Sequence, residues 1–276
     1  MVQHRIDLAK VSSARPTARA YLFPLVAGGL VLLFLLAPWP LHEKAHTLLH
    51  GLCAQRPTHS LLLGGMRLPF DARMTGIYGG FAIASAYLLA RGRYRAAAMP
   101  GKLMLAALML FVGAMGIDGF NSFLVDAALW HPYTPDNRLR LVTGLLCGIT
   151  LAVTICFLLA STLWKRPDLR RPAVEGPFDL ALIVVIQVPY VALVLSGAGW
   201  LYDPVAMLLV LSATAVVSSL VLVAVVLFRQ GDNGFTSVRQ LQGSATMALL
   251  LGIGVMAAFA GGRFLLEHLT GAPPLM

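Results

Sequence analysis

Residues 41–80 hold several side chains that can bind metals. Imidazole and thiolate groups are ligands of Zn and Cu, and histidines and a cysteine recur here at helical spacing. On a helix, His42, His46, His50 and Cys53 would fall within an arc of about 80°. One interpretation is a Zn or Cu site whose ligands are His46, His50, Cys53 and His59. The alternative is an interfacial amphipathic helix over about 41–54 with a histidine-rich polar face.

A second group of polar side chains falls in or beside apolar runs. Asp118, Asn121 and Ser122 share one helix face through their i, i+3, i+4 spacing. Polar groups at membrane depth are costly unless they are paired or face water. We therefore expect either a pocket for a small anionic or lipid ligand, or a network that joins helices. The candidate residues are Arg56, Asp71, Arg73, Thr75, Tyr78, Asp118, Asn121, Arg138, Arg140 and Thr143.

The composition indicates that these residues are positioned by membrane helices. The chain has 276 residues, of which 58% are hydrophobic and 12% charged, whereas a soluble domain carries about 25% charged residues. The net charge of +9 comes from short basic clusters between apolar runs, a pattern of membrane topology rather than of nucleic-acid binding. We predict an all-α, multi-pass bundle in the cell membrane, with about seven transmembrane helices at 21–38, 75–90, 101–127, 139–164, 178–196, 204–228 and 243–266.

The basic residues also predict an orientation. The N-terminal tail and alternate loops carry 14 of the 21 lysines and arginines. The positive-inside rule then places the N-terminus in the cytoplasm and the C-terminus outside. Six of the seven histidines and the stretch Cys53–Gly80 would lie at the outer side.

The chain divides most simply at Lys165–Pro177, which has the composition of a linker. We predict a four-span part over 1–163, which holds most of the polar motifs, and a three-span extension over 164–276. Within the extension, Pro189 follows Gln187 at mid-membrane depth, so we expect a kink there with one interhelical hydrogen bond. Near its end, Arg263 and Glu267 have the i, i+4 spacing of an ion pair.

Part of the chain, from about Leu49 to Ala152, resembles a bacterial family of small predicted membrane proteins with a domain of unknown function. The family pattern has a Cys-His-Gln start, matched here by Cys53-Ala54-Gln55. Its Leu-Pro-x-Cys-Ala-Arg-Cys-Thr-Gly-x-Tyr core is matched by the segment from Leu68 to Tyr78. A later segment is matched by Asp118-Gly119, Asn137, Arg140, Thr143 and Gly144.

This chain departs from that pattern at two cysteines and one histidine. Asp71 and Met74 stand where the family pattern has cysteine, and Ala54 stands where it has histidine. A site built on three cysteines is therefore excluded here. The resemblance implies a fold unit and brings no assigned activity.

Three functions stay open at this point. The chain lacks a P-loop, a dinucleotide fingerprint and a GxSxG motif, which favours a protein that is not an enzyme. We predict a non-catalytic or accessory membrane subunit, with the lipid bilayer and other subunits of a membrane complex as partners. The alternatives are a binder or transporter of a small anionic or lipid ligand, and a metal- or thiol-dependent membrane enzyme.

Overall fold

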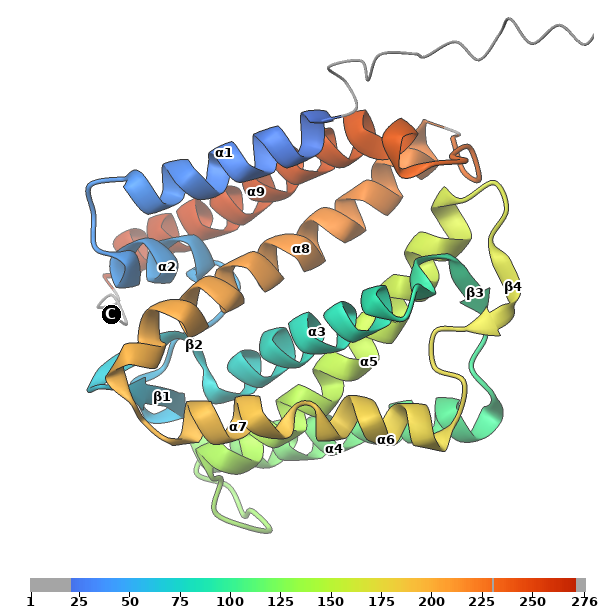
Figure 1. The fold of residues 1–276 in the computed structure, drawn as a ribbon. Coiled ribbons are helices and arrows are strands. Elements are labelled where there is room, and N and C mark those ends of the chain that lie inside the picture. The colour runs from blue at the N-terminus through green and yellow to red at the C-terminus, as the bar shows by residue number, and fades with distance from the viewer. Residues whose placement is uncertain (1–20, 230, 272–276) are drawn as a thin grey trace, which may run out of the picture.

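The computed structural model describes residues 21–229 and 231–271. The basic N-terminal tail used in the orientation argument lies outside these residues. The fold is a bundle of long helices with two small two-stranded sheets, one at each end (Figure 1). In chain order the elements are α1 (Leu22–Leu36), α2 (Leu41–Leu49), β1 (Ser60–Leu63), β2 (Met66–Asp71), α3 (Ala72–Ala90), β3 (Ala96–Ala98), α4 (Lys102–Asp126), α5 (Asn137–Leu163), β4 (Asp168–Pro172), α6 (Pro177–Val185), α7 (Val188–Leu195), α8 (Tyr202–Phe228) and α9 (Val238–Thr270).

The long helices follow the predicted apolar runs, and local signals set several of their ends. Asp71 caps the start of α3, where its side chain accepts a hydrogen bond from the backbone N–H of Met74 at 2.8 Å. Asp136 does the same for α5 through the N–H of Arg138. Gly271, with a φ of 65°, ends α9 in the left-handed conformation.

Among the residues that the structure describes, five helical segments are long and apolar enough to cross a membrane. These segments are α4, α5, α6 with α7, α8 with the short 3-10 turn before it, and α9. Helix α1 is shorter, at 15 residues. The protein is a multi-pass membrane protein, and its fold is a membrane helix bundle.

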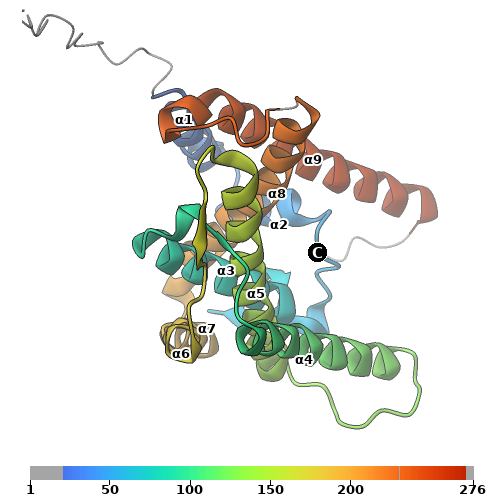
Figure 2. The ribbon, with the colours of Figure 1, turned by 90° about the vertical axis from the view of Figure 1, so that its right-hand side faces the viewer.

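Helices α3 and α5 form the tightest contact and lie at the centre of the core, between α1 and α9 on one side and α4, α6 and α7 on the other (Figure 2). A Cβ at Gly76 would overlap the carbonyl oxygen of Leu141, and one at Gly144 would overlap the backbone of Arg73. The two helices therefore approach through glycines, as close membrane helix pairs do. At both glycines the close neighbour is the backbone of the facing helix.

The two sheets differ from the sequence interpretation, which contained no strands. β1 and β2 form an antiparallel hairpin, joined by Gly64 and Gly65 at φ values of 59° and 81°. β3 pairs in parallel with β4, which lies within the segment 165–177 predicted as a linker. We call the end that carries α2 and β1–β2 the hairpin end, and the end that carries β3, β4 and the α8–α9 turn the basic end.

Two further expectations can be compared directly with the structure. The helix that contains Pro189 is interrupted between α6 and α7, and Gln187 Nε2 donates to the carbonyl of Gly80 at 3.2 Å. This confirms the kink and its interhelical hydrogen bond. The predicted helix 41–54 ends earlier, at Leu49, and it packs against α8, α9 and β2.

Candidate functional site

A cluster of polar residues joins α3, α4 and α5 at the hairpin end. Asp118 on α4 is 1% exposed. One of its oxygens accepts from Arg73 Nη2 at 2.6 Å and the other from the hydroxyl of Tyr133 at 3.1 Å. Burial and this hydrogen bond raise the pKa of Tyr133. Both carboxylate oxygens of Asp118 are therefore occupied by side chains of the protein.

A second arginine enters the same cluster through Ser122. The Ser122 hydroxyl accepts from Arg73 Nη2 at 3.1 Å and from Arg140 Nη2 at 3.3 Å, and donates to the Asp118 carbonyl. Arg140 is 6% exposed and also donates to Asn137 Oδ1 at 2.8 Å. We call Arg73, Asp118, Ser122, Tyr133 and Arg140 the α3–α5 polar cluster.

The other predicted residues of this group lie around the cluster or apart from it. Arg56 pairs with Asp126, and Asn121 donates to the Tyr133 carbonyl. Thr75 and Thr143 bond to nearby backbone carbonyls, and Tyr78 stacks on Phe70. Asp71 serves as the cap of α3. Arg138 is exposed, and its side chain does not enter the cluster.

The predicted metal ligands are spread over different contacts. His46 Nε2 lies 3.1 Å from the Arg67 carbonyl, and His59 lies 3.6 Å from Asp126. Burial lowers the pKa of both histidines. Cys53 is 5% exposed, and burial raises its pKa to about 12. Within 21–229 and 231–271, no three His, Cys, Asp or Glu side chains are placed to hold a metal ion.

His50 belongs to a contact between the loop after α2 and the end of α9. Its ring lies 2.9 Å from both Gln55 Oε1 and Glu267 Oε2 and stacks on Phe264. Glu267 accepts from Arg263 Nε at 2.8 Å, as its spacing predicts. The same guanidinium donates to the carbonyls of His50, Cys53 and Ala54. The imidazole therefore helps to hold α9 against this loop.

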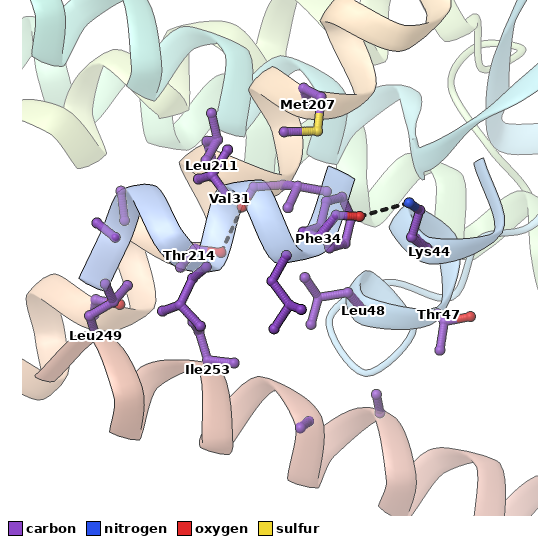
Figure 3. Close-up of a pocket in the computed structure, with 18 of the residues that line it drawn as sticks. Val31, Phe34, Lys44, Thr47, Leu48, Met207, Leu211, Thr214, Leu249 and Ile253 are labelled. Atoms are coloured by element: carbon purple, nitrogen blue, oxygen red, sulfur yellow. Dashed lines mark hydrogen bonds between the residues drawn. The ribbon is translucent and has the colours of Figure 1, made fainter. Parts of the chain in front are cut away.

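A large apolar groove lies away from the α3–α5 polar cluster and reaches the His50 contact through Phe264. It has a volume of about 1020 Å³ and is walled by α1, α2, α8 and α9. Figure 3 shows Val31 and Phe34 of α1, Leu211 of α8 and Ile253 of α9 around this space. The groove runs from Leu222 and Ala245 at one end to Thr47 and Phe264 at the other. We call it the α1–α9 groove.

The groove is open because α1 packs loosely. No residue of α1 is buried, and the helix contacts chiefly α9. Its C-terminal end is fixed by Lys44 of α2, whose Nζ donates to the carbonyls of Phe34, Leu35 and Ala37 at 2.7–3.1 Å. These bonds satisfy carbonyls that the helix end would leave without partners. Lys44 thus holds α1 over the groove, while its ammonium has no donor left for a ligand.

Sequence reasoning did not identify the groove, because its walls are ordinary apolar residues from segments far apart in the chain. It also missed the role of Lys44, whose burial depends on the turn between α1 and α2. A third missed feature lies at the basic end. There Arg93 is 0% exposed and pairs with Glu175 and with Asp179. The sequence suggested only that Arg93 is one of a cluster of topology-setting charges.

The fold and these sites define a helical membrane protein with a closed polar cluster and an apolar groove. Residues 53–154 match the model of a family described as "Predicted membrane protein (DUF2085)". This segment, which contains the α3–α5 polar cluster, is a membrane-protein domain of unknown function, in agreement with the resemblance drawn from its residues. No curated protein and no solved structure matches the chain.

Proposed function

We propose that this is a non-catalytic membrane protein that holds a lipid in the α1–α9 groove. The observation that carries the proposal is the groove itself, about 1020 Å³ of apolar space. Ligand pockets commonly have volumes of about 300–1,000 Å³. A space of this size open to the bilayer takes up hydrocarbon, since water has few polar partners there.

The length of the groove fits an acyl chain that lies along the membrane normal. Its lining runs from Met207 to Leu222 on α8 and from Ala245 to Phe264 on α9. At about 1.5 Å per residue these stretches are roughly 22 and 28 Å long. The hydrocarbon core is about 30 Å thick. A chain in the groove would therefore span most of the hydrophobic depth.

The groove also offers polar atoms to a lipid. Thr47, Glu43 and Trp39 line its end at the hairpin side, where a headgroup or ester could bond.

Two neighbouring alanines of α9 give a matched test. Ala257 lines the groove, whereas Ala258 is exposed on the same helix and does not line it. The protein would be purified in mild detergent, and co-purified lipid would be measured by native mass spectrometry. We expect Ala257→Trp to lower the retained lipid about tenfold, or about 1.4 kcal/mol, and Ala258→Trp to leave it unchanged. Equal retention in the two variants, or a protein helix in the groove in place of lipid, would contradict the proposal.

We also propose a topology of seven crossings with a cytoplasmic N-terminus. In support, α1, α3, α4, α5, α6 with α7, α8 and α9 run alternately between the basic end and the hairpin end (Figure 1). The arginine-rich segments 91–95 and 165–171 both lie at the basic end.

Reporter fusions after Ala90, Asp126 and Thr270 test the proposed topology. Activity of a cytoplasmic reporter only at Ala90 is the expected result, and such activity at Thr270 would overturn the topology.

A further inference from the structure

A small cavity at the basic end is lined almost entirely by cations. It has a volume of about 390 Å³, and its walls are Arg95, Lys165, Arg166 and Thr236. These residues come from three connections that are far apart in the chain: the α3–β3 segment, the segment after α5, and the α8–α9 turn. Figure 1 shows β3, β4 and the α8–α9 turn at this end of the molecule. We call the cavity the basic pocket.

The wall of the basic pocket is held in place before any ligand arrives. The guanidinium carbon of Arg95 lies 4.7 Å from the ring centroid of Trp164, and Arg95 Nη2 donates to the Thr236 carbonyl at 2.8 Å. Trp164 is itself fixed through its Nε1, which donates to the Tyr94 carbonyl at 2.7 Å. The backbone N–H of Lys165 donates to the Phe235 carbonyl at 2.9 Å. The support of the basic pocket is therefore preformed, and the exposed Lys165 and Arg166 complete its wall.

The basic pocket carries positive charge, and no described carboxylate is paired with it. Among the described residues, no carboxylate lies within 4.0 Å of a charged nitrogen of Arg95, Lys165 or Arg166. The nearby Glu175 is occupied by Arg93 and Arg171. In addition, Arg95 Nε is buried and has no hydrogen-bond partner in the described part of the chain. Three like charges around one cavity repel each other unless an anion joins them.

We propose that the basic pocket binds a phosphate group. Planar guanidinium groups bind phosphate oxygens with paired N–H bonds, and a lysine adds a mobile point charge. Basic pockets at the cytoplasmic ends of membrane helices bind phospholipid headgroups. The phosphate can be carried by an anionic lipid or by a soluble compound. The pocket shares no residue with the α1–α9 groove, so it stands independently of the function proposed above.

The test uses the full-length protein in neutral detergent. It is titrated with phosphatidylglycerol, with phosphatidylcholine of the same acyl chains, and with inorganic phosphate, and binding is followed by the shift in Tm. We expect phosphatidylglycerol to raise Tm more than phosphatidylcholine. Competition by inorganic phosphate at comparable concentrations would identify a soluble phosphate compound as the source, and its absence would identify the lipid.

Two double variants separate the pocket from the general charge of this end. Lys165→Gln with Arg166→Gln removes two exposed cations of the pocket and should weaken binding at least about tenfold. Lys102→Gln with Arg170→Gln removes the same residue types, both exposed, from outside the pocket. It should leave the affinity within about twofold. Equal weakening in both double variants, or no binding of any phosphate probe to the wild type, would overturn the proposal.

Discussion

The α3–α5 polar cluster and the α1–α9 groove differ in what they contain. The cluster holds charged and polar side chains that bond to one another, whereas the groove holds open space between apolar side chains. In the cluster, both oxygens of Asp118 are occupied and two arginines share Ser122. In the groove, about 1020 Å³ is open and the walls are mainly apolar. The charged side chains of the cluster are thus bonded to one another, while the room for a ligand lies beside mainly apolar residues.

The buried charges of this bundle join helices to one another. A guanidinium and a carboxylate at membrane depth must find partners, so they tie helices together at fixed positions. The segment that matches a known family, 53–154, contains this cluster and the α3–α5 contact. The groove is formed largely by helices outside that segment. The matched segment therefore supplies the close α3–α5 contact, and α1, α8 and α9 supply most of the walls of the open groove.

Removal of the central carboxylate should have the largest effect on stability. Asp118→Ala leaves the partly buried Arg73 and the buried Arg140 without their carboxylate, which should lower the free energy of unfolding by about 3–5 kcal/mol. Thermal or denaturant unfolding in detergent measures this. The double variant Arg73→Met with Asp118→Leu should recover most of the loss, because it removes both charges. A loss of less than about 1 kcal/mol in Asp118→Ala would mean that the cluster is open to solvent.

The thiol at the hairpin end should be almost unreactive. Burial, followed by the nearby Asp71 carboxylate, raises the pKa of Cys53 from 9.0 to about 12. At a given pH below 9 the thiolate fraction is then about a thousandfold lower than for an ordinary cysteine. Maleimide labelling at pH 8 in a background of Cys147→Ala and Cys156→Ala should be correspondingly slow. Rapid labelling of the folded protein would indicate that this region is as open as the groove.

Two leucine truncations compare the packed half with the groove wall. Leu141 is 0% exposed at the α3–α5 contact, and Leu141→Ala should destabilise the protein by about 2–5 kcal/mol. Leu211 lines the groove and is 46% exposed. Leu211→Ala should change stability by no more than about 0.5 kcal/mol. Equal losses in the two variants would show that the groove is a packed interior.

The smallest expected effect lies in the ion pairs of the basic end. Hydrogen bonds from Arg93 and Arg171 lower the pKa of Glu175 from 4.5 to about 2. A lowered pKa means that this stabilisation is present above pH 4.5 and is lost as the pH falls toward 2. Glu175→Gln should therefore decrease Tm slightly at pH 7 and leave it unchanged near pH 2. Asp232→Asn, at an exposed carboxylate that lines neither the groove nor the basic pocket, is the control and should have little effect at either pH. If Glu175→Gln still lowered Tm at pH 2, the loss of stability would have a cause other than the ion pairs of Glu175.

Much of the helical architecture follows from the sequence, because apolar runs between charged segments leave few other solutions in a membrane. The interruption at Gln187 and the pair of Arg263 with Glu267 also rest on local rules, and both are present. The two sheets were not predicted. Gly64-Gly65 between apolar residues is a hairpin signal that could have been used. The parallel pair of β3 and β4 joins residues some 70 apart, and no local pattern indicates it.

The candidate sites were predictable only in part. Helical spacing placed Asp118 and Ser122 on one face, and the fold adds Tyr133 from an irregular loop. Sequence spacing suggested a common face for His46, His50 and Cys53, but α2 ends at Leu49 and their contacts diverge. The groove and the basic pocket arise from gaps between distant segments. Such gaps depend on how the helices tilt, which composition does not specify.

The contacts of Arg263 bear on the order in which the protein is assembled. This residue is on the last helix, yet its guanidinium donates to the carbonyls of His50, Cys53 and Ala54 near the start of the chain. During synthesis, those carbonyls emerge long before their partner. We therefore expect the loop after α2 to stay accessible to protease until α9 has been inserted. Completion of the hairpin end is then the closing step of biogenesis, and a ribosome-stalled chain that lacks α9 should be cleaved there.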